Sequence, residues 1–346
     1  MGFPSSPVEP SLGSAGPPPD QWDPARWAQA WIVRAPPRSA WQRWGRSAVL
    51  FVVTACSVFL AGALHPVLLP GQGAALVLDV REGIALVVGL LSILFAHEMG
   101  HYLACRYYGV DATLPHFIPS PWFPAVGLAL WQPISMVGTF GAFIRIRGPI
   151  PHRRALFDIG VAGPLAGFLV CLPVLWLGIR GATVQPLAPD AGGLYFGEPL
   201  AFQWVSRLVH GPIPDDKTLV IGQLGLAAWF GLFVTALNLM PIGQLDGGHV
   251  TYALLREKAR LLSRVGSWVC VALIYFGPSW ILWSILVRVL GRRHPPTLDD
   301  EAPVGRGRVV VGLASLVVFV LCFVPNPIVF SWRDFFEAMG LDHLLR

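Results

Sequence analysis

Two histidines and a glutamate lie within five residues of one another in an otherwise apolar stretch of the chain. They are His97, Glu98 and His101, in the sequence LFAHEMGHYLA. On a helix, residues four apart lie on one face, one turn above the other, so both imidazoles can reach the same metal ion. Glu98, one position along, can approach a metal-bound water without being a ligand. HEMGH is therefore an HExxH motif, which predicts one zinc ion bound at this helix.

The alternative is that the two histidines are structural. They would form hydrogen bonds between helices, with Glu98 as a buried partner. An ionisable side chain near the centre of a bilayer costs at least roughly 2.5 to 3.5 kcal/mol, so such residues usually face a cavity and have a function. A structural role explains the polarity of these residues but not their spacing, whereas zinc explains both.

A catalytic zinc ion usually has three protein ligands, so two histidines leave it one ligand short. The favoured third ligand is Asp246, in the sequence NLMPIGQLDGG at the end of a later apolar stretch. An Asp-Gly pair on its own is also an ordinary turn sequence. Cys105, one helical turn after His101, and His249 are the rival ligands, although buried cysteines usually only pack.

Three motifs follow one another along the chain: HEMGH, then GVAGPLAGF, then NLMPIGQLDGG. Together they resemble the site-2 protease family of intramembrane zinc metalloproteases, over roughly residues 83–250. The ordered pattern is far more specific than HExxH alone. Many members of that family carry PDZ or CBS modules, for which this chain has no room, so a compact member is expected. GTFGAFIRI is similar to a segment of compact and plastid-type members, where the neighbouring sheet is thought to receive substrate.

The resemblance implies a role for each polar residue of these motifs. His97, His101 and Asp246 would bind the zinc ion. Glu98 would activate water, and Asn238 would help to hold the substrate or its oxyanion. The implied function is an intramembrane zinc metalloprotease that hydrolyses a peptide bond within or near the transmembrane segment of a membrane-protein substrate.

The alternative function is a zinc-binding membrane protein or zinc transporter without proteolytic activity. A transporter would be expected to have polar residues along several spans, whereas here they gather at one depth. A binding protein without activity would be expected to lose Glu98, which is present. Both observations favour the protease.

The composition predicts a membrane protein, because 54% of the 346 residues are hydrophobic and only 13% are charged. Apolar stretches long enough to cross a bilayer core of about 30 Å recur along the chain. We therefore expect an α-helical polytopic membrane protein with about six or seven transmembrane helices. The predicted spans are 47–69, 83–107, 155–179, 219–240 and 308–324, with either one kinked span or a helical hairpin at 265–290.

Arginines and lysines predict the orientation. They cluster before the first predicted span, after the second, after the fourth and around His294. The positive-inside rule places all four clusters in the cytoplasm, which favours the hairpin at 265–290. The net charge of +5 thus reflects topology, and no nucleic-acid partner is expected. Five cysteines in apolar stretches indicate neither a disulfide framework nor a zinc knuckle.

One region between the spans is not helical in pattern. Residues 111–150 contain several prolines, and GTFGAFIRIR alternates in a strand-like period of two. A small membrane-associated β-hairpin or sheet is expected there, on the cytoplasmic side.

We expect a multi-pass protein of the cell (inner) membrane, with its active site toward the cytoplasm. Its partners would be the lipid bilayer and a membrane-spanning protein substrate. The expected regions are a flexible proline-rich cytoplasmic tail (1–45), a first transmembrane helix and outer loop (46–82), the zinc metalloprotease membrane core (83–250), and a C-terminal transmembrane region and tail (251–346).

Overall fold

Helices make up most of the described chain. The computed structural model describes residues 41–69, 73–120, 137–187, 195–290 and 297–328. Its helices are η2 (Trp41–Gly45), α2 (Arg46–Ala63), α3 (Val80–Tyr107), α6 (Arg153–Arg180), α7 (Leu200–His210), α8 (Gln223–Leu239), α9 (Asp246–Leu255), η3 (Arg256–Lys258), α10 (Ala259–Leu273), α11 (Ser279–Leu290) and α12 (Arg306–Cys322). Its strands are β1 (Leu64–Leu69), β2 (Gly73–Leu78), β3 (His116–Pro119), β4 (Thr139–Phe143), β5 (Thr183–Pro186) and β6 (Lys217–Val220). The predicted proline-rich tail lies outside the described residues as far as position 40.

Three of the described helices, α2, α3 and α6, are long and apolar enough to cross a membrane. Helices α3 and α6 have 28 residues each, which is about 42 Å at 1.5 Å per residue and exceeds a bilayer core of about 30 Å. Helix α8 is apolar but shorter. A mainly helical protein with small sheets and candidate membrane-spanning helices is therefore confirmed. The three such helices among the described residues are fewer than the six or seven expected.

The first span ends earlier than the sequence predicted. Helix α2 stops at Ala63, and the next residues form strand β1, in which Leu64 lies opposite Leu78 of the antiparallel strand β2. Pro66 falls in this stretch, and a proline inside a helix removes a backbone donor and clashes with the preceding turn. The prediction of a helix to residue 69 is therefore wrong at its C-terminal end.

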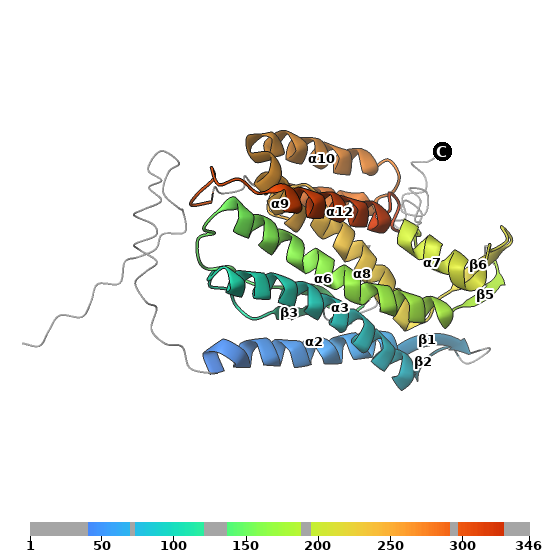
Figure 1. Cartoon of the computed structure of the whole chain (residues 1–346). Coiled ribbons are helices and arrows are strands. Elements are labelled where there is room, and N and C mark those ends of the chain that lie inside the picture. The colour runs from blue at the N-terminus through green and yellow to red at the C-terminus, as the bar shows by residue number, and fades with distance from the viewer. Residues whose placement is uncertain (1–40, 70–72, 121–136, 188–194, 291–296, 329–346) are drawn as a thin grey trace, which may run out of the picture. The chain divides into compact units, whose positions relative to one another are not determined.

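Helices α3, α6 and α8 pack on one another and form the core of the described part (Figure 1). Helix α2 lies along α3 on one side, and α12 contacts α6 and α8 on the other. Small residues bring the helices close together: Gly100 of α3 faces the backbone of Ala162, and Gly178 of α6 faces Gly225 of α8. Close packing of this kind carries the polar residues of α3 into the interior.

The strand-like region between α3 and α6 forms the small sheet that the sequence predicted. Strands β3 and β4 are antiparallel, with Phe117 opposite Ala142. The ring of Phe117 is buried and packs edge-on against Phe51 of α2, with 5.0 Å between the ring centroids. In the described residues β4 pairs with a strand on one edge, β3. Residues 121–136, between the two strands, lie outside the described part.

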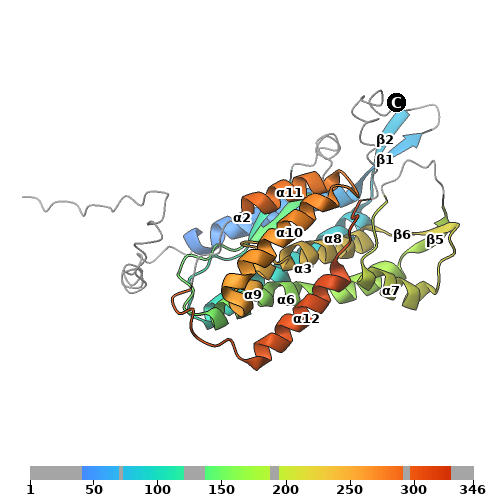
Figure 2. The same cartoon turned by 90° about the horizontal axis from the view of Figure 1, so that it is seen from above.

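Residues 265–290 form parts of two helices rather than one kinked span. Helix α10 ends at Leu273 and α11 begins at Ser279, with Pro278 in the short connection between them. The two helices contact each other, and α10 also contacts α9 (Figure 2). This arrangement agrees with the hairpin that the orientation of the arginine clusters favoured.

Candidate functional site

Three side-chain atoms of the kind that bind metal ions converge in the interior, from two segments that are distant in the chain. We call the three residues that carry them the donor group. His97 and His101 lie one turn apart on α3, and Asp246 is the first residue of α9. Oδ2 of Asp246 lies 3.2 Å from Nε2 of each histidine, and the two Nε2 atoms are 3.1 Å apart. Both histidines are buried and Asp246 is half-buried. Among the described residues, these three form the one group of His, Cys, Asp and Glu side chains close enough to hold a metal ion.

The spacing of these atoms fits a metal ion. Ligand atoms at about 2.0 to 2.1 Å from a tetrahedral zinc ion lie about 3.3 Å from one another, close to the separations of 3.1 and 3.2 Å in this group. Nδ1 of His101 donates a hydrogen bond of 2.7 Å to the carbonyl oxygen of Ile159. This bond leaves the lone pair of Nε2 facing the other donors, as histidine ligands of metals require.

Glu98 and Asn238 lie beside the three donor atoms. The Glu98 side chain is buried and lies close to the backbone of Ile144, just after β4. Asn238, near the end of α8, has its Nδ2 atom 3.3 Å from Nε2 of His97. With His97 they line one cavity of about 230 Å³. A carboxylate, a side-chain amide and one histidine of the candidate metal site thus line one cavity.

The rival ligands predicted from sequence occupy other positions. Cys105 is fully buried and packs with Val110 and Ile159 in a small apolar cluster. His249 lies on α9, where its Cβ faces Gly160 of α6. In the described part of the chain, neither residue belongs to the group of donor atoms.

The glycine-rich motif on α6 makes room for the histidines. A side chain at Gly163 would overlap the His101 imidazole, and a Cβ at Gly167 would lie 3.1 Å from the Cβ of His97. A face of small residues generally lets neighbouring helices pack closely. In the structure the packing is against the two histidines of the site, so the motif helps to fix the positions of their rings.

The two glycines after Asp246 allow the start of α9 to lie close against the end of α8 and the turn that follows it. A Cβ at Gly247 would overlap the backbone carbonyl of Leu239, and one at Gly248 would overlap that of Gly243. Asp246 can therefore reach the histidines from a turn that larger residues would push away. The glycines of the third motif, NLMPIGQLDGG, thus have a local steric reason.

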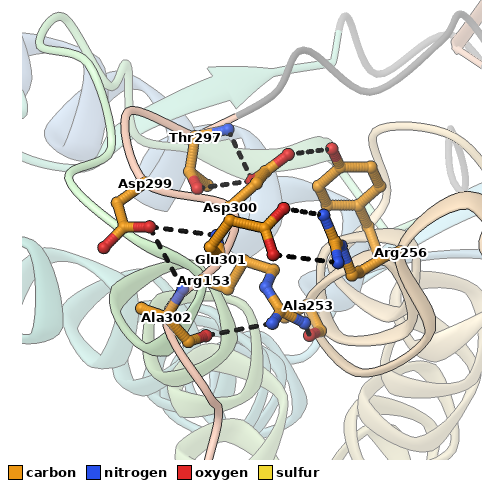
Figure 3. A network of polar contacts seen from close by, with 9 residues as sticks. Arg153, Ala253, Arg256, Thr297, Asp299, Asp300, Glu301 and Ala302 are labelled. Carbon is orange, nitrogen blue, oxygen red and sulfur yellow. Dashed lines mark hydrogen bonds and ion pairs between the residues drawn. The ribbon is translucent and has the colours of Figure 1, made fainter.

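A network of polar contacts ties the far end of α9 to α6 and to the loop before α12 (Figure 3). Arg153, at the start of α6, is buried and donates hydrogen bonds of 3.0 Å to the carbonyls of Ala253 and Ala302. Asp300 accepts hydrogen bonds from Thr297 and from the hydroxyl of Tyr252. Burial would raise the pKa of Asp300, but these hydrogen bonds hold it below its ordinary value.

A second polar cluster joins three helices near His101. Arg308 of α12 forms two hydrogen bonds, of 2.8 and 2.6 Å, with the carboxylate of Asp158 on α6. Tyr108, at the end of α3, donates to the same carboxylate. Asp158 directly precedes Ile159, whose carbonyl holds His101. Sequence reasoning missed this cluster because its members are far apart in the chain.

Known proteins are similar to this chain over the segment that contains the candidate site. The family model of peptidase family M50 matches residues 85–275. The chain is 29% identical over 269 residues to "Probable zinc metalloprotease EGY1, chloroplastic" of Arabidopsis thaliana, covering 76% of this chain and 45% of that protein. It is 29% identical over 257 residues to "Probable zinc metalloprotease EGY2, chloroplastic" of Oryza sativa subsp. indica, covering 72% and 44%.

The chain spans less than half the length of these relatives. No solved structure matches it significantly. The family match covers more than half of the chain and includes His97, His101 and Asp246. The chain therefore belongs to peptidase family M50, the site-2 protease family.

Proposed function

We propose that this chain is a zinc-dependent endopeptidase that cuts a peptide bond within or near the transmembrane segment of another membrane protein. The observation that carries the proposal is the convergence of His97, His101 and Asp246 beside the buried carboxylate of Glu98. Membership of peptidase family M50 supports it. The relatives named above are described as probable zinc metalloproteases, which supports zinc as the metal.

The residues divide into ligands and groups that handle the substrate. His97, His101 and Asp246 would hold one zinc ion, which when bound lowers the pKa of a water molecule and polarises the carbonyl to be cut. The Glu98 carboxylate would take a proton from the attacking water and return it to the leaving amine. The Asn238 amide would donate a hydrogen bond to the oxygen of the same carbonyl.

The substrate must be extended where it is cut, because a helix keeps its carbonyls in hydrogen bonds with amides four residues on. Strand β4 lines the cavity beside Glu98 through Thr139, Gly141 and Ala142. A segment that pairs with the edge of β4 opposite β3 would be held extended next to the carboxylate. We therefore infer that the substrate binds as an added strand.

We also propose an orientation of the chain in the membrane. Arg106 in the last turn of α3, together with Arg145 and Arg147 after β4, would keep the catalytic end of α3 toward the cytoplasm. The membrane would be the cell (inner) membrane.

Glu98→Gln tests the proposed chemistry. The variant keeps the shape of the side chain and should fold and retain zinc, because Glu98 is not one of the proposed ligands. Cleavage of a single-span membrane substrate in detergent or lipid should nevertheless fall by at least about 100-fold. Zinc content and cleavage rate are measured on the same preparation. Full zinc with unchanged cleavage would remove Glu98 from the mechanism, and loss of zinc would make it structural.

A further inference from the structure

The cavity beside Glu98 is mostly apolar and larger than the reacting groups need. Its volume is about 230 Å³. Its polar lining includes His97, Glu98 and Asn238, and most of its other lining residues belong to α3, α8, α11 and the strand β4. The apolar side chains of the three helices that line it include Leu90, Leu94, Phe230, Val234, Trp283 and Val287.

Two wall residues come from α11. Trp283 is buried, and its ring packs edge-on against Phe233 of α8, with 5.4 Å between the ring centroids. Val287, one turn further on, is also buried. Both positions lie beyond residue 275, where the match to the family model ends. This wall is therefore built by a part of the chain that the family match does not cover.

We propose that this cavity receives one large apolar side chain of the substrate, next to the bond that is cut, and that Trp283 and Val287 set the size of side chain accepted. The inference rests on the proposed function and adds a substrate class to it. The preferred substrate has leucine, methionine or phenylalanine at this one position, and a charged side chain there is rejected.

The volume supports one side chain of that size. An apolar cavity of about 150 Å³ in another protein is large enough to bind benzene. A space of about 230 Å³ therefore accommodates a leucine or phenylalanine side chain and leaves an alanine with much of its surroundings unfilled. Each methylene group in an apolar pocket changes discrimination by about 10- to 200-fold, so a difference between leucine and alanine is measurable.

The geometry of strand β4 supports a preference for an apolar side chain at only one position of the substrate. Side chains of an extended segment point alternately to opposite faces. If the substrate pairs with β4, a side chain that enters the cavity has neighbours in sequence that point away from it. Gly141 lines the cavity at a φ of +100°, and a Cβ there would meet nothing within 4 Å. The strand thus leaves space where a substrate side chain would pass.

The experiment measures kcat/KM for the full chain in detergent, using single-span peptides in which each residue flanking the cut is replaced in turn by Ala, Leu, Phe or Asp. One position should prefer Leu over Ala by at least about 10-fold and reject Asp. Trp283→Ala should shift preference at that position toward Phe, and Val287→Phe should shift it toward Ala. Trp280→Ala is the matched control, because Trp280 is also buried on α11 but does not line the cavity.

A change of selectivity at the same position in either cavity variant, with the control unchanged, supports the proposal. Equal kcat/KM for Ala and Leu at every position overturns it, as does a selectivity that both cavity variants leave unchanged. Val287→Phe keeps the test decisive if Trp283→Ala does not fold. A wild-type chain that cuts no peptide would instead contradict the proposed function itself, so the two failures are distinguishable.

Discussion

Asp246 differs from the two histidines in coming from a second helix, so its contribution to metal binding can be tested alone. Asp246→Asn keeps the size of the side chain but removes the negative charge. Zinc affinity should fall by at least about 10-fold, and cleavage should be lost. Cys105→Ser is the control, since Cys105 packs in an apolar cluster outside the donor group. Metal analysis of both purified variants checks this, and zinc loss in the cysteine variant alone would identify the wrong third ligand.

Gly163 allows the His101 ring to lie against α6. In Gly163→Ala the new methyl group would overlap the imidazole, so His101 must move away from Ile159 and Asp246. Zinc affinity should fall by about 10- to 100-fold, as it does when the groups that orient metal ligands are lost. Competition with a chelator measures this affinity.

The matched control is Gly181→Ala, at the C-terminal end of the same helix. A Cβ at Gly181 has its nearest neighbour at 3.5 Å, an ordinary contact. Its zinc affinity should equal that of the wild type. Equal affinities in all three proteins would show that contact between α6 and His101 does not control the metal site.

Helix α9 is held at both ends. At its N-terminal end Asp246 contacts the two histidines of α3, and near its C-terminal end Arg153 donates a hydrogen bond to the carbonyl of Ala253. Arg153→Met removes two charge-assisted hydrogen bonds and leaves the carbonyls of Ala253 and Ala302 without this donor. The free energy of unfolding should fall by about 1.5 to 3 kcal/mol. Denaturant titration in detergent, followed by circular dichroism, measures the change.

The neighbouring residue provides the control. Arg154 is exposed and donates one hydrogen bond, to the carbonyl of Pro303. Arg154→Met should therefore change the free energy of unfolding by less than about 1 kcal/mol. A larger loss for Arg154 than for Arg153 would mean that the buried network does not hold α9 in place.

The sequence predicted which segments are helical better than it predicted where each helix ends. The apolar stretch from residue 47 continues past Ala63, and hydropathy does not distinguish the last turn of a helix from a following apolar strand. Arg153 counted as one of the charges that orient the chain, but its side chain is buried among backbone carbonyls. Such contacts depend on residues about 100 positions away, which local patterns cannot reveal.

The donor group was the most predictable part of the site, because its three residues belong to short motifs that can be recognised in the sequence. The spacing of His97 and His101 and the position of Asp246 led to residues that the fold does bring together. Their roles, and those of Glu98 and Asn238, stay predictions. The cluster of Tyr108, Asp158 and Arg308 was missed, since its partners are joined by tertiary packing of α3, α6 and α12.

For the whole molecule, the distribution of arginines predicts a cytoplasmic position for Trp44 and an outer position for Asp215. Both residues are exposed in the structure. Single cysteines at these positions, in a Cys56→Ser background, are treated with a membrane-impermeant maleimide on intact cells. The cysteine at 215 should react and that at 44 should react only after lysis. Reaction at 44 from outside would reverse the orientation.

The donor group joins α3 to α9, and both α6 and α8 lie between them in the chain. During synthesis, the two histidines therefore enter the membrane well before Asp246 has left the ribosome. The nascent protein passes through insertion with an incomplete set of ligands. Under the proposed function, hydrolysis could begin only after α9 has been made and has packed onto α6, which it contacts in the structure.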